Sequence, residues 1–165
     1  MVPAVLMALV ATVQAGAPTA VVLPSQAVEG SVSVALAPAD ALARLADPTW
    51  VRSVDAGGTT VTIRQREGDC VVADYTSPST LLTVRYTVRQ CPTGHGYRSV
   101  LVASDTFATY DAEWIVAPDR TGSLLTYRIQ LTPSFPLPVS FITGTIRRDI
   151  LSMMERFHAT FGPPA

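Results

Sequence analysis

Apolar and polar residues alternate along most of the stretch from residue 59 to residue 131 of this 165-residue chain. A period of two is typical of β-strands with one buried face, and clusters rich in Gly, Pro, Asp and Ser separate the alternating stretches. The pattern predicts six consecutive strands, at residues 59–66, 70–76, 81–90, 97–104, 107–117 and 124–131. A similar stretch at residues 30–36 predicts a first strand. Because short connections join antiparallel neighbours, we expect one antiparallel sheet of seven strands.

The alternation assigns a different chemistry to each face of this sheet. One face carries the charged residues Arg64, Asp74, Arg85, Arg89, Asp111, Glu113 and Arg128. The other carries Val61, Ile63, Val71, Ala73, Tyr75, Leu82, Val84, Tyr86, Val88, Ala108, Tyr110, Ala112, Trp114, Val116, Leu125, Tyr127, Ile129 and Leu131. A sheet with one apolar face needs a partner that covers that face.

The C-terminal region supplies such a partner. From Val139 to Phe161 apolar residues recur at spacings of three and four, which predicts an amphipathic helix of about 23 residues and about 35 Å. A short helix is predicted at residues 39–46 and is expected to end at Pro48, which leaves Trp50 and Val51 in an irregular segment. The fold class is therefore α+β, a curved antiparallel sheet wrapped around a long C-terminal helix.

The N-terminal residues resemble a targeting segment. Residues 1–13 are almost wholly apolar, and the small residues Val13 and Ala15 flank Gln14 as in a signal-peptidase site. We expect a cleaved signal peptide at 1–15, a linker at 16–27 and one domain at 28–165, and hence an exported protein, periplasmic or extracellular. A retained membrane anchor is the alternative, although Pro3 and Pro18 interrupt the apolar run.

Composition excludes several other classes of protein. Hydrophobic residues make up 48% of the chain and charged residues 15%, so the chain is not intrinsically disordered. The net charge is −1, with no basic cluster, which disfavours nucleic-acid binding. No spacing of His, Cys or carboxylate residues suggests a metal site, and we expect no cofactor and a monomer.

The two cysteines are predicted to form a disulfide. If strands 70–76 and 81–90 pair so that facing residue numbers sum to 161, Tyr75 faces Tyr86 and the apolar residues of both strands share one face. The same register places Cys70 opposite Cys91, within the distance that a disulfide spans. An exported chain with an even number of cysteines favours oxidation.

The apolar face also contains the candidate ligand-binding residues. Tyrosine combines an apolar ring with a polar tip, and methionine adapts to irregular shapes, so the set would suit an apolar guest. The sheet contributes Tyr75, Tyr86, Tyr110, Ala112, Trp114 and Tyr127, and the helix contributes Met153, Met154 and Phe157. The alternative is that these residues simply fill the core.

Catalytic residues are harder to find. His95 lies in a Gly-rich turn and His158 lies near the end of the last helix. No acidic residue is predicted on the apolar face, so neither histidine has an obvious partner there. We assign no catalytic residue.

Several local motifs together resemble a known family. The segments are 110–114 (YDAEW), 118–122 (PDRTG), 125–127 (LTY), 136–138 (PLP) and 147–151 (RRDIL). With the order of elements, they resemble the START-like helix-grip superfamily (SRPBCC), in its bacterial polyketide cyclase and coenzyme-Q-binding branch, over about residues 28–161. The resemblance implies a helix-grip fold with a short helix pair after the first strand, and an apolar ligand held between the sheet and the last helix.

Two classes of function follow from this resemblance. The first is non-enzymatic binding or transport of an apolar small molecule that is lipid-, quinone- or sterol-like. The second is a cyclase- or aromatase-like enzyme that acts through the shape of its cavity, and a structural envelope protein is a third possibility. The expected export favours the first, because polyketide intermediates are tethered to cytoplasmic carriers.

Overall fold

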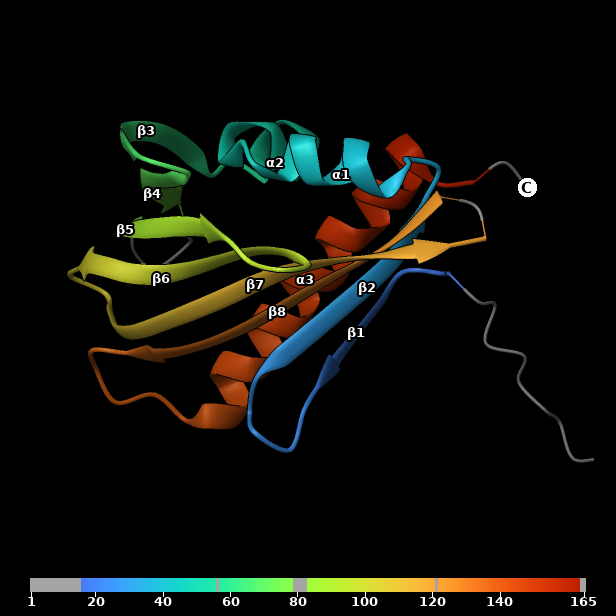
Figure 1. The fold of residues 1–165 in the computed structure, drawn as a ribbon. Coiled ribbons are helices and arrows are strands. Elements are labelled where there is room, and N and C mark those ends of the chain that lie inside the picture. The colour runs from blue at the N-terminus through green and yellow to red at the C-terminus, as the bar shows by residue number, and fades with distance from the viewer. Residues whose placement is uncertain (1–15, 56, 79–82, 121, 164–165) are drawn as a thin grey trace, which may run out of the picture.

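The computed structural model describes residues 16–55, 57–78, 83–120 and 122–163, and shows a curved sheet with a long helix across its concave face (Figure 1). The expected signal peptide lies outside these residues, as does the start of the strand expected at 81–90. In chain order the elements are β1 (Thr19–Val22), β2 (Val28–Val34), α1 (Pro38–Leu45), α2 (Pro48–Asp55), β3 (Thr60–Glu67), β4 (Cys70–Pro78), β5 (Thr83–Pro92), β6 (Gly96–Ser104), β7 (Phe107–Asp119), β8 (Gly122–Pro133) and α3 (Val139–Phe161).

The strands form one antiparallel sheet in the order β1-β2-β8-β7-β6-β5-β4-β3. The α+β fold, the long final helix and the pair of short helices agree with the sequence prediction. The described sheet contains eight strands, one more than the predicted seven, because β1 lies inside the segment expected to be a linker. Four residues are too few to show a period, and only Ala20 of β1 is buried.

The segment expected to be irregular around Trp50 and Val51 is helix α2. Pro48 does not only end the region of α1: it is the first residue of α2, where proline is well tolerated because no partner exists for its missing N–H. The Asp47 side chain accepts a hydrogen bond from the Thr49 backbone N–H at 2.9 Å, as an N-cap residue does. This eight-residue helix becomes important below, because it brings a charged side chain to the concave face.

The predicted register between β4 and β5 is confirmed. Tyr75 faces Tyr86 and Val71 faces Gln90. The predicted disulfide is present between Cys70 and Cys91, with the Cα atoms 4.3 Å apart. The bond joins the ends of the two strands that carry Tyr75 and Tyr86.

Helix α3 packs on the concave face, and the core lies between them. Phe157 and Met154 of α3 and Leu125 of β8 are fully buried. Gly30 of β2 allows α3 to approach closely, because a Cβ at this position would overlap the Ile150 side chain. At the C-terminal end of the helix, the Ala35 backbone N–H donates to the Phe161 carbonyl at 2.6 Å, which fastens that end to the chain after β2.

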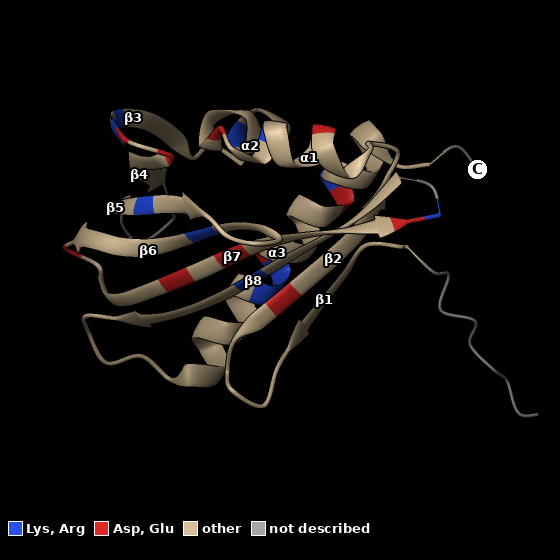
Figure 2. Ribbon diagram, in the orientation of Figure 1, with Lys and Arg blue, Asp and Glu red and all other residues tan. Residues whose placement is uncertain are grey.

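Charged residues recur along the strands of the sheet (Figure 2), and the alternation of the strands places them on the face opposite α3. Three ion pairs join neighbouring strands, namely Arg64–Asp74, Arg98–Asp111 and Arg128–Glu29. A fourth, Arg89–Glu67, reaches from β5 across β4 to β3. Such exposed pairs contribute little to stability, roughly 0–1 kcal/mol each, but they keep this face solvated.

The two edges of the sheet differ from its centre. The β1 edge is four residues long. At the other edge, the pairing of β3 with β4 shifts between Ile63 and Gln65, which marks a bulge. Among the described residues no helix is long and apolar enough to cross a membrane.

Candidate ligand-binding site

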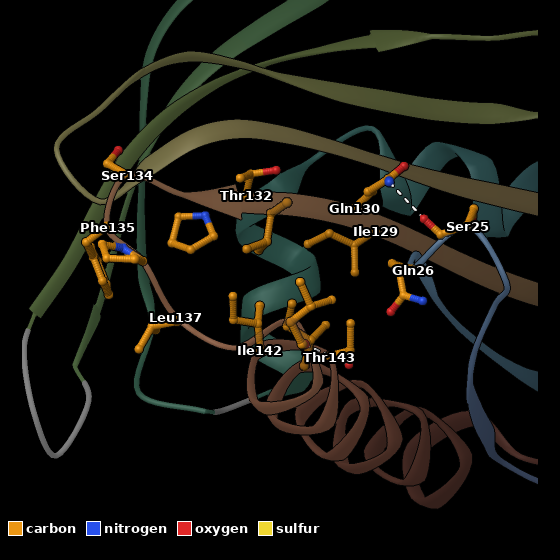
Figure 3. Close-up of a pocket in the computed structure, with 15 residues that line it drawn as sticks. Ser25, Gln26, Ile129, Gln130, Thr132, Ser134, Phe135, Leu137, Ile142 and Thr143 are labelled. Atoms are coloured by element: carbon orange, nitrogen blue, oxygen red, sulfur yellow. Dashed lines mark hydrogen bonds between the residues drawn. The ribbon is translucent and has the colours of Figure 1, made fainter.

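A cavity of about 500 Å³ lies between β8 and the N-terminal half of α3 (Figure 3). Ile129 and Thr132 of β8 and Ile142 and Thr143 of α3 border the same space from opposite sides. The full lining is Ser25, Gln26, Ile129, Gln130, Leu131, Thr132, Pro133, Ser134, Phe135, Pro136, Leu137, Val139, Ile142, Thr143 and Ile146. Its volume lies within the range of about 300–1,000 Å³ that is typical of small-molecule sites.

The sequence explains why this end of the interface is open. The connection from β8 to α3 contains Pro133, Pro136 and Pro138, which favour an extended path and keep it from packing down as a helix. Ile142 and Ile146 are four residues apart and lie on one side of the helix. The Thr143 hydroxyl donates to the Val139 carbonyl at 3.0 Å, so this buried hydroxyl is satisfied within the helix. The cavity wall on the helix is therefore effectively apolar.

The mouth of the cavity exposes large apolar side chains. Phe135 and Leu137 of the connection are more than one-third exposed, and Val139 of α3 is more than half exposed; all three line the cavity. From residue 131 to residue 146 the chain carries no charged side chain. An apolar molecule can therefore approach this mouth without displacing a charge from water.

At the other half of α3 the same interface is filled by an aromatic layer. Tyr75 stacks on Tyr86, with ring centroids 5.0 Å apart, and the Tyr86 ring lies 5.2 Å from that of Tyr110. The centroid of the Trp114 ring lies 4.6 Å from that of Tyr127 and 5.6 Å from that of Phe157. The Tyr110 and Tyr127 hydroxyls form a hydrogen bond of 3.1 Å.

The aromatic layer leaves only a small cavity of about 20 Å³, enough for one water molecule. It is lined by Pro48, Val51, Arg52, Tyr75, Gln90, Tyr110, Trp114, Tyr127 and Met153. Arg52 comes from α2, and its guanidinium carbon lies 5.5 Å from the centre of the Tyr75 ring. The pattern of the strands gave no indication of this arginine.

Arg52 belongs to a small charged network at the edge of this cavity. Its Nη1 donates to Asp55 Oδ2 at 2.7 Å, and Arg156 Nη1 of α3 donates to Asp55 Oδ1 at 2.8 Å. Arg156 Nη1 also donates to the Asp55 carbonyl. The single negative charge of Asp55 is therefore shared by two arginines.

One donor of Arg52 has no partner. In the described part of the chain, its Nε is the one buried side-chain nitrogen or oxygen for which no hydrogen bond is found. A buried unpaired donor costs about 1–3 kcal/mol, and more when the group is charged. Such an atom beside a cavity indicates a place where a hydrogen-bond acceptor can bind.

The small cavity has a positively charged side chain in its lining and no negatively charged one. Burial raises the pKa of Tyr86 to about 12 and raises the pKa values of Tyr75, Tyr110 and Tyr127 as well, so these four hydroxyls are neutral near pH 7. Burial acts to lower the pKa of Arg52, but the nearby tyrosines outweigh it and the net direction is upward. The site thus combines a fixed cation with neutral hydroxyl groups.

The family to which the chain belongs follows from a comparison of sequences. The sequence profile of the family described as polyketide cyclase / dehydrase and lipid transport matches residues 25–161. The chain belongs to this family. No curated protein matches the chain.

Several solved structures share the fold of this family member. A START superfamily protein from Mycobacterium smegmatis is similar with a TM-score of 0.72 and 11% identity, covering 82% of this chain and 96% of that one. The ZhuI aromatase/cyclase of a Streptomyces species is similar with a TM-score of 0.64 and 16% identity, covering 81% of this chain and 92% of that one. The lipid transfer and protein localization domain of human StarD13 is similar with a TM-score of 0.65 and 16% identity, covering 84% of this chain and 78% of that one.

The structure brings most of the sequence-predicted site residues into one layer. Tyr75, Tyr110, Trp114, Tyr127 and Met153 line the small cavity. Tyr86 and Phe157 contact these rings, while Ala112 and Met154 are buried beside them in the core. None of the nine predicted residues lines the 500 Å³ cavity. The apolar wall of that cavity is formed by residues of the strand alternation and of the helical spacing, namely Ile129, Leu131, Ile142 and Ile146.

Other expectations about the site concern charged and metal-binding groups. The prediction of no acidic residue on the apolar face concerned the strands, and it did not cover Asp55, which is 8% exposed and belongs to α2. His95 and His158 are both exposed. Across the described residues no group of three or more His, Cys, Asp or Glu side chains is close enough to hold a metal ion.

Proposed function

We propose that this protein binds, and in this way carries, an apolar small molecule that is lipid-, quinone- or sterol-like, without transforming it. The observation that supports this function is the 500 Å³ cavity between β8 and α3, with its apolar wall and its exposed apolar mouth. The family description includes lipid transport, and StarD13, a structural relative, is named for lipid transfer. Burial of each methylene group of such a ligand contributes about 0.8 kcal/mol, so a cavity of this size supports useful affinity.

A cyclase- or aromatase-like reaction is the second candidate, and it has less support. The family description and the ZhuI relative favour it. However, the described residues that line the two cavities include no His, Cys, Asp, Glu or Lys. A general base would have to come from elsewhere, because Asp55 is already bonded to Arg52 and Arg156.

We infer that the protein acts outside the cytoplasm, after removal of residues 1–15. The disulfide supports this location, because such bonds persist in oxidising compartments. N-terminal sequencing of protein from its own host should find a chain that begins near Gly16. An intact Met1 in a soluble cytoplasmic fraction would refute this inference.

A blocked cavity tests the proposed function. N-phenyl-1-naphthylamine is neutral, apolar and fluorescent when it leaves water, and it should bind the purified protein. Ile142→Trp places an indole into the cavity and should weaken binding at least tenfold. Val102→Trp is the matched control, because Val102 is 53% exposed on β6 and adds the same indole away from the cavity. It should change affinity less than twofold.

Two results would contradict the proposal. Equal affinity of wild type and Ile142→Trp would show that the cavity is not the site, and absence of binding by wild type would refute the function. Mass spectrometry of an organic extract of the native protein then identifies the natural ligand. A stoichiometric apolar compound is expected, and an extract without one would count against the proposal.

A further inference from the structure

Arg52 and the tyrosines around it are not explained by stability alone. The side chains with polar groups that line the 20 Å³ cavity are Arg52, Tyr75, Gln90, Tyr110, Trp114 and Tyr127. The Tyr110 and Tyr127 hydroxyls are bonded to each other, and the Gln90 amide nitrogen donates to the Leu45 carbonyl at 3.0 Å. A core filled only for packing would gain from an apolar residue in place of Arg52, since burial of a cation is costly. The arrangement instead resembles a binding site for one oxygen atom with a negative charge.

The charges around Arg52 leave room for a second anion. Asp55 accepts from both Arg52 and Arg156, so the three groups together carry a net charge of +1. The Arg52 Nε is buried without a partner on the side chain that lines the cavity. Among the side chains that line this cavity, Arg52 carries the only formal charge. An incoming carboxylate would therefore gain a charge-assisted hydrogen bond and lose no existing one.

The small cavity lies next to the large one on the same sheet surface. Tyr110, which lines the small cavity, is the cross-strand partner of Leu131, which lines the large one. On β8, Tyr127 of the small cavity is two residues from Ile129 of the large cavity, and both point to the concave face. A single elongated molecule could therefore contact both cavities.

We propose that the ligand is an acidic amphiphile, an apolar molecule that ends in a carboxylate, and that Arg52 holds this carboxylate with the help of the Tyr110 and Tyr127 hydroxyls. This inference rests on the proposed function and narrows its substrate class. The apolar body of the ligand lies between β8 and α3, and its carboxylate takes the place of the water-sized space beside Arg52. Met153, a flexible side chain in the cavity lining, moves to admit the head.

Two probes that differ only in charge test the proposal. Cis-parinaric acid and its methyl ester have the same fluorescent apolar chain, and the purified full-length protein is titrated with each at pH 7.5. Wild type should bind the acid at least tenfold more tightly than the ester. Arg52→Gln should remove this preference. It should weaken binding of the acid at least tenfold and binding of the ester less than twofold.

Arg66→Gln is the matched control. It removes one arginine charge from an exposed position on β3, and Arg66 neither lines the cavity nor belongs to the Arg52–Asp55–Arg156 network. It should leave the preference for the acid within twofold of wild type. If Arg66→Gln abolishes the preference as Arg52→Gln does, the effect comes from the net charge of the protein and the proposal is wrong.

The remaining outcomes separate this inference from the proposed function. Equal binding of acid and ester by wild type overturns the inference, because the cavity then holds only water, yet it leaves apolar binding intact. Binding of neither probe refutes the proposed function. The wild-type comparison needs no variant, so it decides the matter even if Arg52→Gln fails to fold.

Discussion

The two halves of α3 cover the same sheet with different results. The C-terminal half, with Met153 and Phe157, meets the aromatic layer and leaves a cavity of about 20 Å³. The N-terminal half, with Ile142 and Ile146, leaves about 500 Å³. The hydrophobic period is the same in both halves, so periodicity does not decide where a cavity forms. The size of the side chains and the way the ends are held decide it.

The C-terminal half of α3 and the strands that it covers, here the closed half, are held by several independent contacts. The Cys70–Cys91 bond joins the strands below it, α2 closes its side through Arg52 and Asp55, and Ala35 holds the end of the helix. The open half, at the N-terminal end of α3, ends in a proline-rich connection that single hydrogen bonds hold, from the Ser134 backbone N–H to the Thr106 carbonyl and from Arg147 Nε to the Ala20 carbonyl. The comparison suggests that one end of the interface supplies stability and the other supplies volume.

Alkaline pH should affect the closed half most strongly. The four clustered tyrosines have pKa values above the ordinary value near 10, with Tyr86 at about 12. Below pH 10 both folded and unfolded chains keep these protons. Above pH 10 the unfolded chain loses them first, so stability falls through the range from pH 10 to 12, by up to about 1.4 kcal/mol per tyrosine per pH unit.

Urea unfolding between pH 8 and pH 11.5 measures this effect, with absorbance at 295 nm to report phenolate. Tyr86→Phe should make the dependence less steep. A stability that stays constant to pH 11.5 would contradict the burial of these hydroxyls.

Truncation of one side chain in each half tests the comparison directly. Phe157 is fully buried against Trp50 and Trp114, so Phe157→Ala should lower the free energy of unfolding by about 3–5 kcal/mol. Ile142 already borders empty space, so Ile142→Ala removes fewer contacts and should cost less than about 1.5 kcal/mol. Chemical denaturation with an unchanged m value gives both numbers. Equal losses would mean that the two halves are packed alike.

Loss of the disulfide should separate stability from binding. The bond closes a loop with a sequence separation of 21, which corresponds to about 3 kcal/mol in the chain-entropy account. The double variant Cys70→Ser, Cys91→Ser should lose about this much stability. It should still bind N-phenyl-1-naphthylamine within twofold of wild type at a temperature where it is folded. A large loss of dye affinity in the folded variant would show that the two halves are coupled.

Sequence patterns predicted those features that depend on strand alternation. The faces of the sheet, the register of β4 with β5 and the Cys70–Cys91 bond all follow from the alternation of residues 70–91. The long helix follows from its spacing of three and four. These features were predictable because a shift by one residue would exchange the buried and the exposed faces.

Other features depend on information that a local pattern does not contain. The periodicity did not show helix α2, which only the resemblance implied, because Pro48 can end one helix and begin another. Arg52 of α2 was therefore not among the predicted site residues. A ligand between the sheet and the last helix was implied by the resemblance, but the position of the 500 Å³ cavity along that interface was not predicted, although the apolar faces that carry Ile129 and Ile142 were. A pattern indicates which side chains point inward, but the space that they leave depends on the distance between helix and sheet.

The bulge in β3 has a consequence for the behaviour of the protein in concentrated solution. An edge strand offers unpaired backbone groups to a neighbouring molecule, and regular edges can join into larger sheets. The shift between Ile63 and Gln65 breaks that regularity, and Arg64 and Arg66 place charge on the same strand. At the opposite edge β1 offers only four residues. Edge-to-edge aggregation is thus disfavoured at both edges of the sheet.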